Sequence, residues 1–247
     1  MGKEDLRETY HAVRERIGEA AARGGRKAED VAVVAVTKYT ELDRVRALID
    51  LGHADFGENQ GQQLAQRVPQ IEEFAARKRQ LGGESAAERI RWHMVGHLQR
   101  NKVKQVVPLV DLVHSVDSLR LIEELHNYGA KIDSEVDILL QVNISGETSK
   151  SGVLPPAVIP LIEQIDLMMH LRLRGLMTMA PQADNPEDIR PVFRRCRELF
   201  EECAQLEASG PDFNLLSMGM SGDYEVAVEE GANVVRLGRA LFGERDA

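Results

Sequence analysis

Cysteine is scarce in this sequence. The 247 residues contain two cysteines, Cys196 and Cys203, both in the segment PVFRRCRELFEECAQLE. That segment has a helical pattern, and on a helix the two thiols would lie about two turns apart, which is too far for a disulfide. We therefore expect two reduced thiols and a reducing compartment.

Long apolar runs are also lacking. Every apolar run is shorter than the roughly 18 residues that a membrane-spanning helix needs. The opening stretch, MGKEDLRETYHAVRERIGEA, carries charges throughout and lacks the apolar segment of a secretory signal. These absences predict a cytoplasmic protein without a membrane partner.

Positive charge is in deficit. The formal net charge is -9 at pH 7. A protein built around the phosphates of a nucleic acid usually carries an excess of lysine and arginine. We therefore expect no nucleic-acid partner.

No stretch rich in proline, glycine and serine divides the chain, so we expect a single domain. The polar insertion ARKRQLGGESAAER (76–89) is interpreted as a mobile helix end or a loop. Short apolar runs alternate with amphipathic or charged stretches along the rest of the chain. The strand candidates are 31–36, 54–58, 90–96, 112–116, 137–144, 173–179, 213–219 and 233–238.

Eight strands alternating with helices is the number that closes a parallel barrel, whose strands are buried on both faces and read as continuous apolar runs. The pattern predicts the α/β class and a single-domain (β/α)8 TIM barrel over about residues 31–243. An extra helix over about residues 4–22 precedes it. An open, doubly wound sheet is the alternative that the pattern leaves.

The seventh strand candidate ends in a loop of small residues. The segment SMGMSGD (217–223) includes Ser217 and Gly219, and a helix candidate follows it. In a barrel of this type a phosphate is often held by the loops after strands seven and eight. Gly238 and Arg239 follow the eighth strand and can add backbone amides to a phosphate site. Taken alone, such glycines are explained equally well by tight turns.

A lysine ends the first strand candidate. VAVVAV (31–36) is followed by Thr37 and Lys38. At the mouth of a barrel the amine would be sheltered from water, which favours the neutral nucleophile. A neutral lysine near a phosphate site suggests a Schiff base with a phosphorylated aldehyde, of which pyridoxal 5'-phosphate (PLP) is the common one. Without that neighbourhood, an ordinary lysine at a loop edge is the simpler interpretation.

Two histidines, His93 and His97, lie close together in WHMVGH (92–97). They invite a metal interpretation, but the glutamate of a zinc-protease motif is missing and the segment is a strand running into a turn. We expect the histidines to line the barrel mouth or to satisfy local hydrogen bonds, and we expect no metal.

Seven segments, in this order along the chain, resemble the YggS/PROSC family of pyridoxal-phosphate-binding proteins. Members of this family are similar in fold to the N-terminal barrel of alanine racemase, the PLP fold type III. The segments are AVTK (35–38), FGEN (56–59), WHMVGHLQRNK (92–102), VNISGETSKSG (142–152), GLMTM (175–179), LSMGMSGDYEVAVEEGA (216–232) and VRLGRALFGERD (235–246).

The resemblance implies a role for each matching position. It implies a covalent aldimine of PLP at Lys38, and Arg236 facing the pyridine nitrogen. Asn59 would lie near the ring hydroxyl and Met177 against the ring face. Ser217, Gly219, Gly238 and Arg239 would hold the phosphate; Arg239 departs from the small hydroxyl residue that is common in relatives.

The resemblance also implies a function in intracellular PLP homeostasis without substantial substrate turnover, with PLP as the ligand and PLP-dependent apoenzymes as possible partners. An arginine only donates hydrogen bonds, so it leaves the pyridine nitrogen unprotonated and the ring a weak electron sink. Racemisation needs a second acid/base, which the racemases supply from a separate β-domain. The alternative is a PLP-dependent amino-acid racemase.

Overall fold

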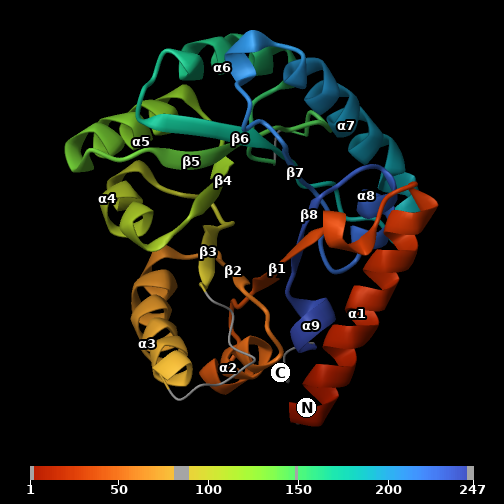
Figure 1. Cartoon of the computed structure of the whole chain (residues 1–247). Coiled ribbons are helices and arrows are strands. Elements are labelled where there is room, and N and C mark those ends of the chain that lie inside the picture. The colour runs from red at the N-terminus through yellow and green to blue at the C-terminus, as the bar shows by residue number, and fades with distance from the viewer. Residues whose placement is uncertain (1–2, 81–88, 148–149, 244–247) are drawn as a thin grey trace.

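The computed structural model describes residues 3–80, 89–147 and 150–243. Its centre is a closed barrel in which neighbouring strands are parallel and follow one another in chain order (Figure 1). Pairing of β1 with both β2 and β8 closes the ring, which confirms the barrel and excludes the open sheet. The strands are β1 (Ala32–Val36), β2 (Asp55–Glu58), β3 (Arg91–Met94), β4 (Leu112–Val116), β5 (Val136–Gln141), β6 (Leu171–Met177), β7 (Leu215–Ser217) and β8 (Val234–Leu237).

Helices form an outer ring around these strands (Figure 1). They are α1 (Lys3–Arg23), α2 (Leu42–Asp50), α3 (Gly61–Gln80), α4 (Val103–Val106), α5 (Leu119–Ile132), α6 (Val158–Asp166), α7 (Arg190–Ala204), α8 (Tyr224–Glu229) and α9 (Arg239–Phe242). None of the described helices is long and apolar enough to cross a membrane.

The helix α1 is the predicted addition before the barrel. It packs beside α8 and α9, so the start of the described chain covers its end (Figure 1). Leu6, Val13 and Ile17 are buried and recur at helical spacing, which gives α1 one apolar stripe for this contact.

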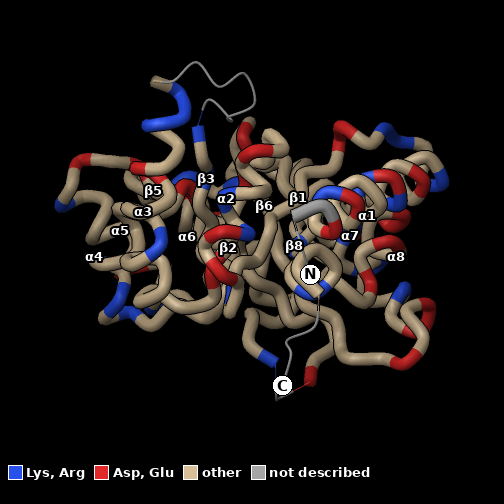
Figure 2. Tube along the Cα trace, turned by 90° about the horizontal axis from the view of Figure 1, so that it is seen from below, with Lys and Arg blue, Asp and Glu red and all other residues tan. Residues whose placement is uncertain are grey.

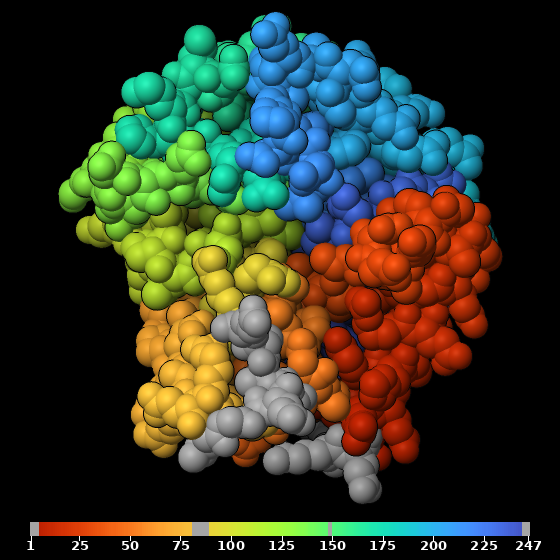
Figure 3. Space-filling view, viewed as in Figure 1, coloured from red at the N-terminus to blue at the C-terminus, as the bar shows by residue number. Residues whose placement is uncertain are grey.

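Side chains fill the barrel. Along β1, Val33 and Ala35 belong to the main apolar core, whereas Val34 packs in a separate small cluster with Val95 and Val234. Successive strand residues point to opposite faces, so this division separates the layer under the helices from the barrel interior. The surface is correspondingly closed over the centre of the ring (Figure 3).

The polar insertion 76–89 begins inside the helix α3 and continues past its end. Residues 76–80 belong to the last turns of α3, and residues 81–88 lie outside the described residues. The interpretation of this segment as a helix end is confirmed as far as Gln80.

Candidate functional site

A cavity of about 1560 Å³ lies where the strands end. Its lining comes from the ends of β1, β2, β3, β5, β6, β7 and β8 and the segments after them, which the barrel brings to one face. Five of the predicted site residues line it: Lys38, Asn59, Arg236, Gly238 and Arg239.

The other three predicted residues lie near the cavity but are not among its lining residues. Met177 is fully buried in the barrel interior against Leu112 and Leu139. Met179, two residues further on, lines the cavity instead. A ring-facing role for Met177 therefore stays a prediction, and the methionines that line the cavity are Met179 and Met220.

Ser217 and Gly219 lie outside the cavity lining and hydrogen-bond Arg236, which belongs to it. The Ser217 hydroxyl is fully buried and accepts a hydrogen bond of 2.6 Å from Arg236 Nη1. Gly219 has φ of 93°, and its carbonyl accepts the Arg236 backbone N–H at 3.1 Å. A Cβ at position 219 would lie 2.6 Å from the Ala227 Cβ, so this close turn requires glycine.

Lys38 leaves β1 at the edge of the cavity and is half-buried. Its Nζ lies 4.8 Å from the centroid of the Tyr39 ring. Tyr39 has φ of 63°, a left-handed conformation that costs about 1 kcal/mol or more for a non-glycine residue. A strained residue beside the candidate nucleophile indicates that the surrounding structure fixes this loop.

A buried polar network provides that fixation. Thr37 Oγ1 donates to Glu58 Oε1 at 2.5 Å, and Arg67 Nε pairs with the same oxygen at 2.9 Å. Arg67 Nη2 also donates to the Thr40 carbonyl at 2.6 Å. The network ties both ends of the loop that carries Lys38 to β2 and α3.

Glu58 is the centre of this network and is fully buried. Burial raises the pKa of its carboxyl, while the Thr37 hydrogen bond and the charge of Arg67 act in the opposite direction. Glu58 is not among the predicted site residues, although it stands next to Asn59 in FGEN. A charged residue inside a strand pattern is the signal that would have found it.

Asn59 is placed by a close approach between the ends of β2 and β3. A Cβ on Gly96 would lie 2.3 Å from the Asn59 carbonyl oxygen, so only glycine allows the two segments to meet. This contact brings Asn59 and His97 to the cavity wall.

The loop after β7 offers hydrogen-bond donors. Within the described chain, the backbone N–H groups of Ser221 and Gly222 donate to no other residue, and both residues line the cavity. The Ser221 hydroxyl accepts the Ala240 N–H at 3.0 Å, which joins this loop to the start of α9. Unpaired amides on neighbouring residues suit an anionic group such as a phosphate.

Arg236 enters the cavity from β8. The side chain is almost fully buried, and Nη2 donates to the Thr178 carbonyl at 2.9 Å. Burial lowers the pKa of Arg236 to about 10, partly offset by the charge of Asp223. The guanidinium thus remains a cation at neutral pH, and the hydrogen-bond partners of its side chain among the described residues are uncharged, the Ser217 hydroxyl and the Thr178 carbonyl.

The two histidines of the metal interpretation satisfy local contacts, as expected. His97 lines the cavity, and its Nδ1 lies 3.2 Å from Asp117 Oδ2. His93 lies inside the barrel, with Nε2 at 3.1 Å from Asp55 Oδ1. The described residues contain no group of three or more side chains suited to a metal ion.

Comparison with known proteins places the chain in a family. The model of the alanine racemase N-terminal domain matches residues 11–246. The pyridoxal phosphate homeostasis protein of Aquifex aeolicus is 35% identical over 242 residues, covering 96% of this chain and 97% of the relative. That of Escherichia coli K12 is 34% identical over 243 residues, covering 98% and 97%.

Solved structures agree with this placement. A protein of unknown function from Bifidobacterium adolescentis superposes with a TM-score of 0.86 at 36% identity, covering 97% of this chain and 95% of that one. PipY of Synechococcus elongatus with PLP bound gives a TM-score of 0.70 at 30% identity, covering 87% and 93%. Alanine racemase of Clostridium difficile, at 13% identity and a TM-score of 0.66, shares the fold over 99% of this chain and 57% of its own length. The chain therefore belongs to the YggS/PROSC family of pyridoxal phosphate homeostasis proteins, which have the fold of the alanine racemase N-terminal domain.

Proposed function

We propose that this protein binds PLP in the cavity at the strand ends and serves intracellular PLP homeostasis. The observation that carries the proposal is the meeting of an amine, two backbone amides that donate to no other described residue, and a buried guanidinium in one cavity: Lys38, Ser221, Gly222 and Arg236. The names of the relatives and the PLP-bound PipY structure support it.

The residues present fit the chemical groups of PLP. When bound, PLP supplies an aldehyde carbon that an amine can attack with loss of one water. Lys38 is the amine that lines the cavity. The amides of Ser221 and Gly222, with Gly238 and Arg239 beside them, would hold the phosphate, and the Ser217 and Gly219 positions support that loop.

Arg236 favours storage over turnover. A guanidinium has donors only, so at the ring nitrogen it would hold that nitrogen unprotonated. An unprotonated ring withdraws electrons weakly from a bound amino acid. We therefore propose that the protein holds the cofactor and passes it to PLP-dependent apoenzymes in the cytoplasm. The two free, buried cysteines suit a reducing compartment.

The test is a spectral titration of the purified protein with PLP, followed by borohydride reduction and peptide mapping. We expect an absorbance band near the visible edge that survives dialysis and a reduced label on Lys38. Lys38→Ala should abolish both. Lys27→Ala is the matched control because Lys27 is highly exposed and outside the cavity, and it should leave both unchanged.

Two results would overturn the proposal. A label on another side chain, or no label, would refute the attachment site. Racemisation of L-alanine at an ordinary enzymatic rate, lost in Lys38→Ala, would replace storage by catalysis.

A further inference from the structure

A continuous chain of hydrogen-bonded side chains crosses the barrel interior, and the site described above uses only its last members. It starts at Asp55, the first residue of β2, whose Oδ1 lies 3.1 Å from His93 Nε2. His93 Nδ1 lies 3.0 Å from His114 Nε2, and His114 Nδ1 lies 3.0 Å from Ser217 Oγ. Ser217 Oγ then accepts from Arg236 Nη1 at 2.6 Å. The chain thus joins the end of the barrel where strands begin to the cavity where they end.

The two ends of the chain fix the direction of every proton in it. Arg236 can only donate, so Ser217 Oγ accepts from it and can give its own proton to His114. His114 then donates through Nε2 to His93 Nδ1, and His93 donates through Nε2 to Asp55. Each neutral imidazole has one donor and one acceptor nitrogen, which is what this arrangement requires. All bonds therefore run in the same sense, from the guanidinium to the carboxylate.

We propose that Asp55 is the remote counter-charge of Arg236, and that His93, His114 and Ser217 are positioning residues that transmit its effect through this chain. The ligand-binding part of the inference rests on the proposed function. The part that concerns proton positions does not.

The physical reason is polarisation. A buried arginine without an ion partner is costly, and hydrogen bonds in series strengthen one another in a medium of low dielectric. Each bond makes the next acceptor more negative, so part of the effect of the Asp55 carboxylate reaches Ser217 Oγ. Arg236 is thereby held as a cation without a carboxylate hydrogen-bonded to it, and the charge of Asp223, which also lines the cavity, acts in the same direction.

The groups around the chain keep its ends in the required charge states. Burial alone would raise the pKa of Asp55, but hydrogen bonds from His93 and Arg91 outweigh it and hold the carboxyl ionised. Burial, with the charge of Arg236, holds the pKa of His114 far below its usual value, so this imidazole is neutral. A neutral His114 is the form that the chain needs.

The first experiment reads the proton positions directly in the ligand-free wild-type protein. Long-range ¹H–¹⁵N correlation spectra at pH 7, assigned through bonds to the backbone, report which ring nitrogen of each histidine carries hydrogen. We expect both His93 and His114 to be neutral and protonated on Nε2. A proton on Nδ1 of His114, or on both nitrogens of His93, would reverse the chain and overturn the proposal.

The second experiment measures the effect on the ligand. Asp55→Asn removes the charge at the far end of the chain and should weaken the Kd for PLP about fivefold, the effect of one modest hydrogen bond. Asp111→Asn is the matched control. Asp111, like Asp55, pairs with an arginine, Arg89, but it lies outside the chain and its carboxylate accepts the Trp92 backbone N–H instead of a histidine N–H.

The outcomes separate the two proposals. An equal effect of Asp55→Asn and Asp111→Asn, or no effect of Asp55→Asn, would refute the role of Asp55 as counter-charge. Absence of PLP binding by the wild-type protein would refute the proposed function, and the histidine spectra would still decide the direction of the chain.

Discussion

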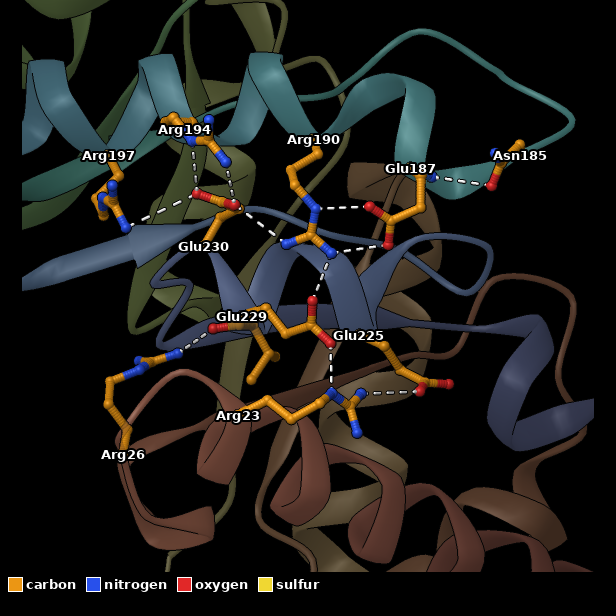
Figure 4. Close-up of polar contacts among 11 residues, drawn as sticks. Arg23, Arg26, Asn185, Glu187, Arg190, Arg194, Arg197, Glu225, Glu229 and Glu230 are labelled. Carbon is orange, nitrogen blue, oxygen red and sulfur yellow. Dashed lines mark hydrogen bonds and ion pairs between the residues drawn. The ribbon is translucent and has the colours of Figure 1, made fainter.

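Charged groups are arranged in opposite ways inside the barrel and on its outer helices. Inside, Arg236 and Asp55 are joined only through neutral side chains. Outside, α1, α7 and α8 carry interleaved charges of both signs (Figure 2). There, arginines and glutamates pair directly in what we call the outer cluster: Arg23, Arg190, Arg194, Arg197, Glu187, Glu225, Glu229 and Glu230 (Figure 4).

The outer cluster is redundant. Arg190 pairs with Glu187, Glu229 and Glu230 at 2.7, 2.5 and 3.1 Å. Glu230 is also within 3.2 Å of Arg194, so the loss of one partner leaves others (Figure 4). The cluster fixes α8 between α7 and α1, and α8 directly follows the loop of Ser221 and Gly222. Direct pairing here serves the packing of helices around the barrel.

The difference shows that the same residue types serve two purposes. Networks of partly exposed ion pairs add stability in small, shared increments. A buried charge adds little stability or reduces it, and it is retained where its field or its donors are needed. The outer cluster should therefore control unfolding, and the inner chain should control binding.

The substitution Arg236→Met should have the largest effect. It tests whether the hydrogen-bond chain inside the barrel controls binding. Loss of a charge-assisted donor should weaken the Kd for PLP about 30-fold. The free energy of unfolding should stay within about 1 kcal/mol of wild type, because a desolvated charge is replaced by an apolar side chain. Spectral titration and urea unfolding measure the two quantities. A large loss of stability with unchanged affinity for PLP would show that the inner chain controls unfolding and not binding.

Glu230→Gln tests whether the outer cluster controls unfolding. The variant should lose about 2 kcal/mol of unfolding free energy at pH 7 and keep its affinity for PLP. Burial alone would raise the pKa of Glu230, but hydrogen bonds from Arg194 and Arg190 outweigh it and place the pKa below the ordinary value of 4.5. A lowered pKa means stabilisation that is present above pH 4.5 and disappears as the pH falls through the folded-state value.

The difference between wild type and Glu230→Gln should therefore shrink in acid. Urea unfolding at pH 7 and at successive values below pH 4.5 measures it. A difference that is independent of pH would show that packing, and not the charge of Glu230, is responsible.

Arg195→Ala is the smallest expected effect. Arg195 lies on α7 like Arg190, Arg194 and Arg197 of the outer cluster, but its pair with Glu198 at 3.3 Å is exposed on both sides. The variant should change the unfolding free energy by less than about 0.5 kcal/mol. A loss as large as that of Glu230→Gln would mean that burial and redundancy do not distinguish the cluster from an ordinary surface pair.

Much of the candidate site was predictable because the barrel converts sequence position into spatial position. Lys38, Asn59 and Arg236 were selected as strand-end residues, and the closed ring brings all three to one cavity. The Met177 prediction is the least supported. β6 continues to Met177, and the side chain packs into the interior, so the cavity is reached two residues later.

Glu58 and His114 show that the apolar pattern of a strand does not reveal the hydrogen-bond partners of its polar residues. Each is a polar residue in a buried strand, and its partners come from other elements of the barrel: Thr37 after β1 and Arg67 on α3 for Glu58, and Ser217 on β7 for His114. Their roles depend on which side chains meet across the barrel, which requires the register and the closure of the sheet.

The sequence by itself determined the number and order of the strands, the lysine at the end of the first and the small residues after the seventh, because local apolar runs and turn residues encode these features. Only the tertiary structure decided that Arg236 faces neutral acceptors, that Asp55 stands at the far end of its hydrogen-bond chain, and that the outer arginines pair directly. The physical reason is that electrostatic and hydrogen-bond energies depend on distances between atoms of different strands and helices, which become defined when the barrel closes.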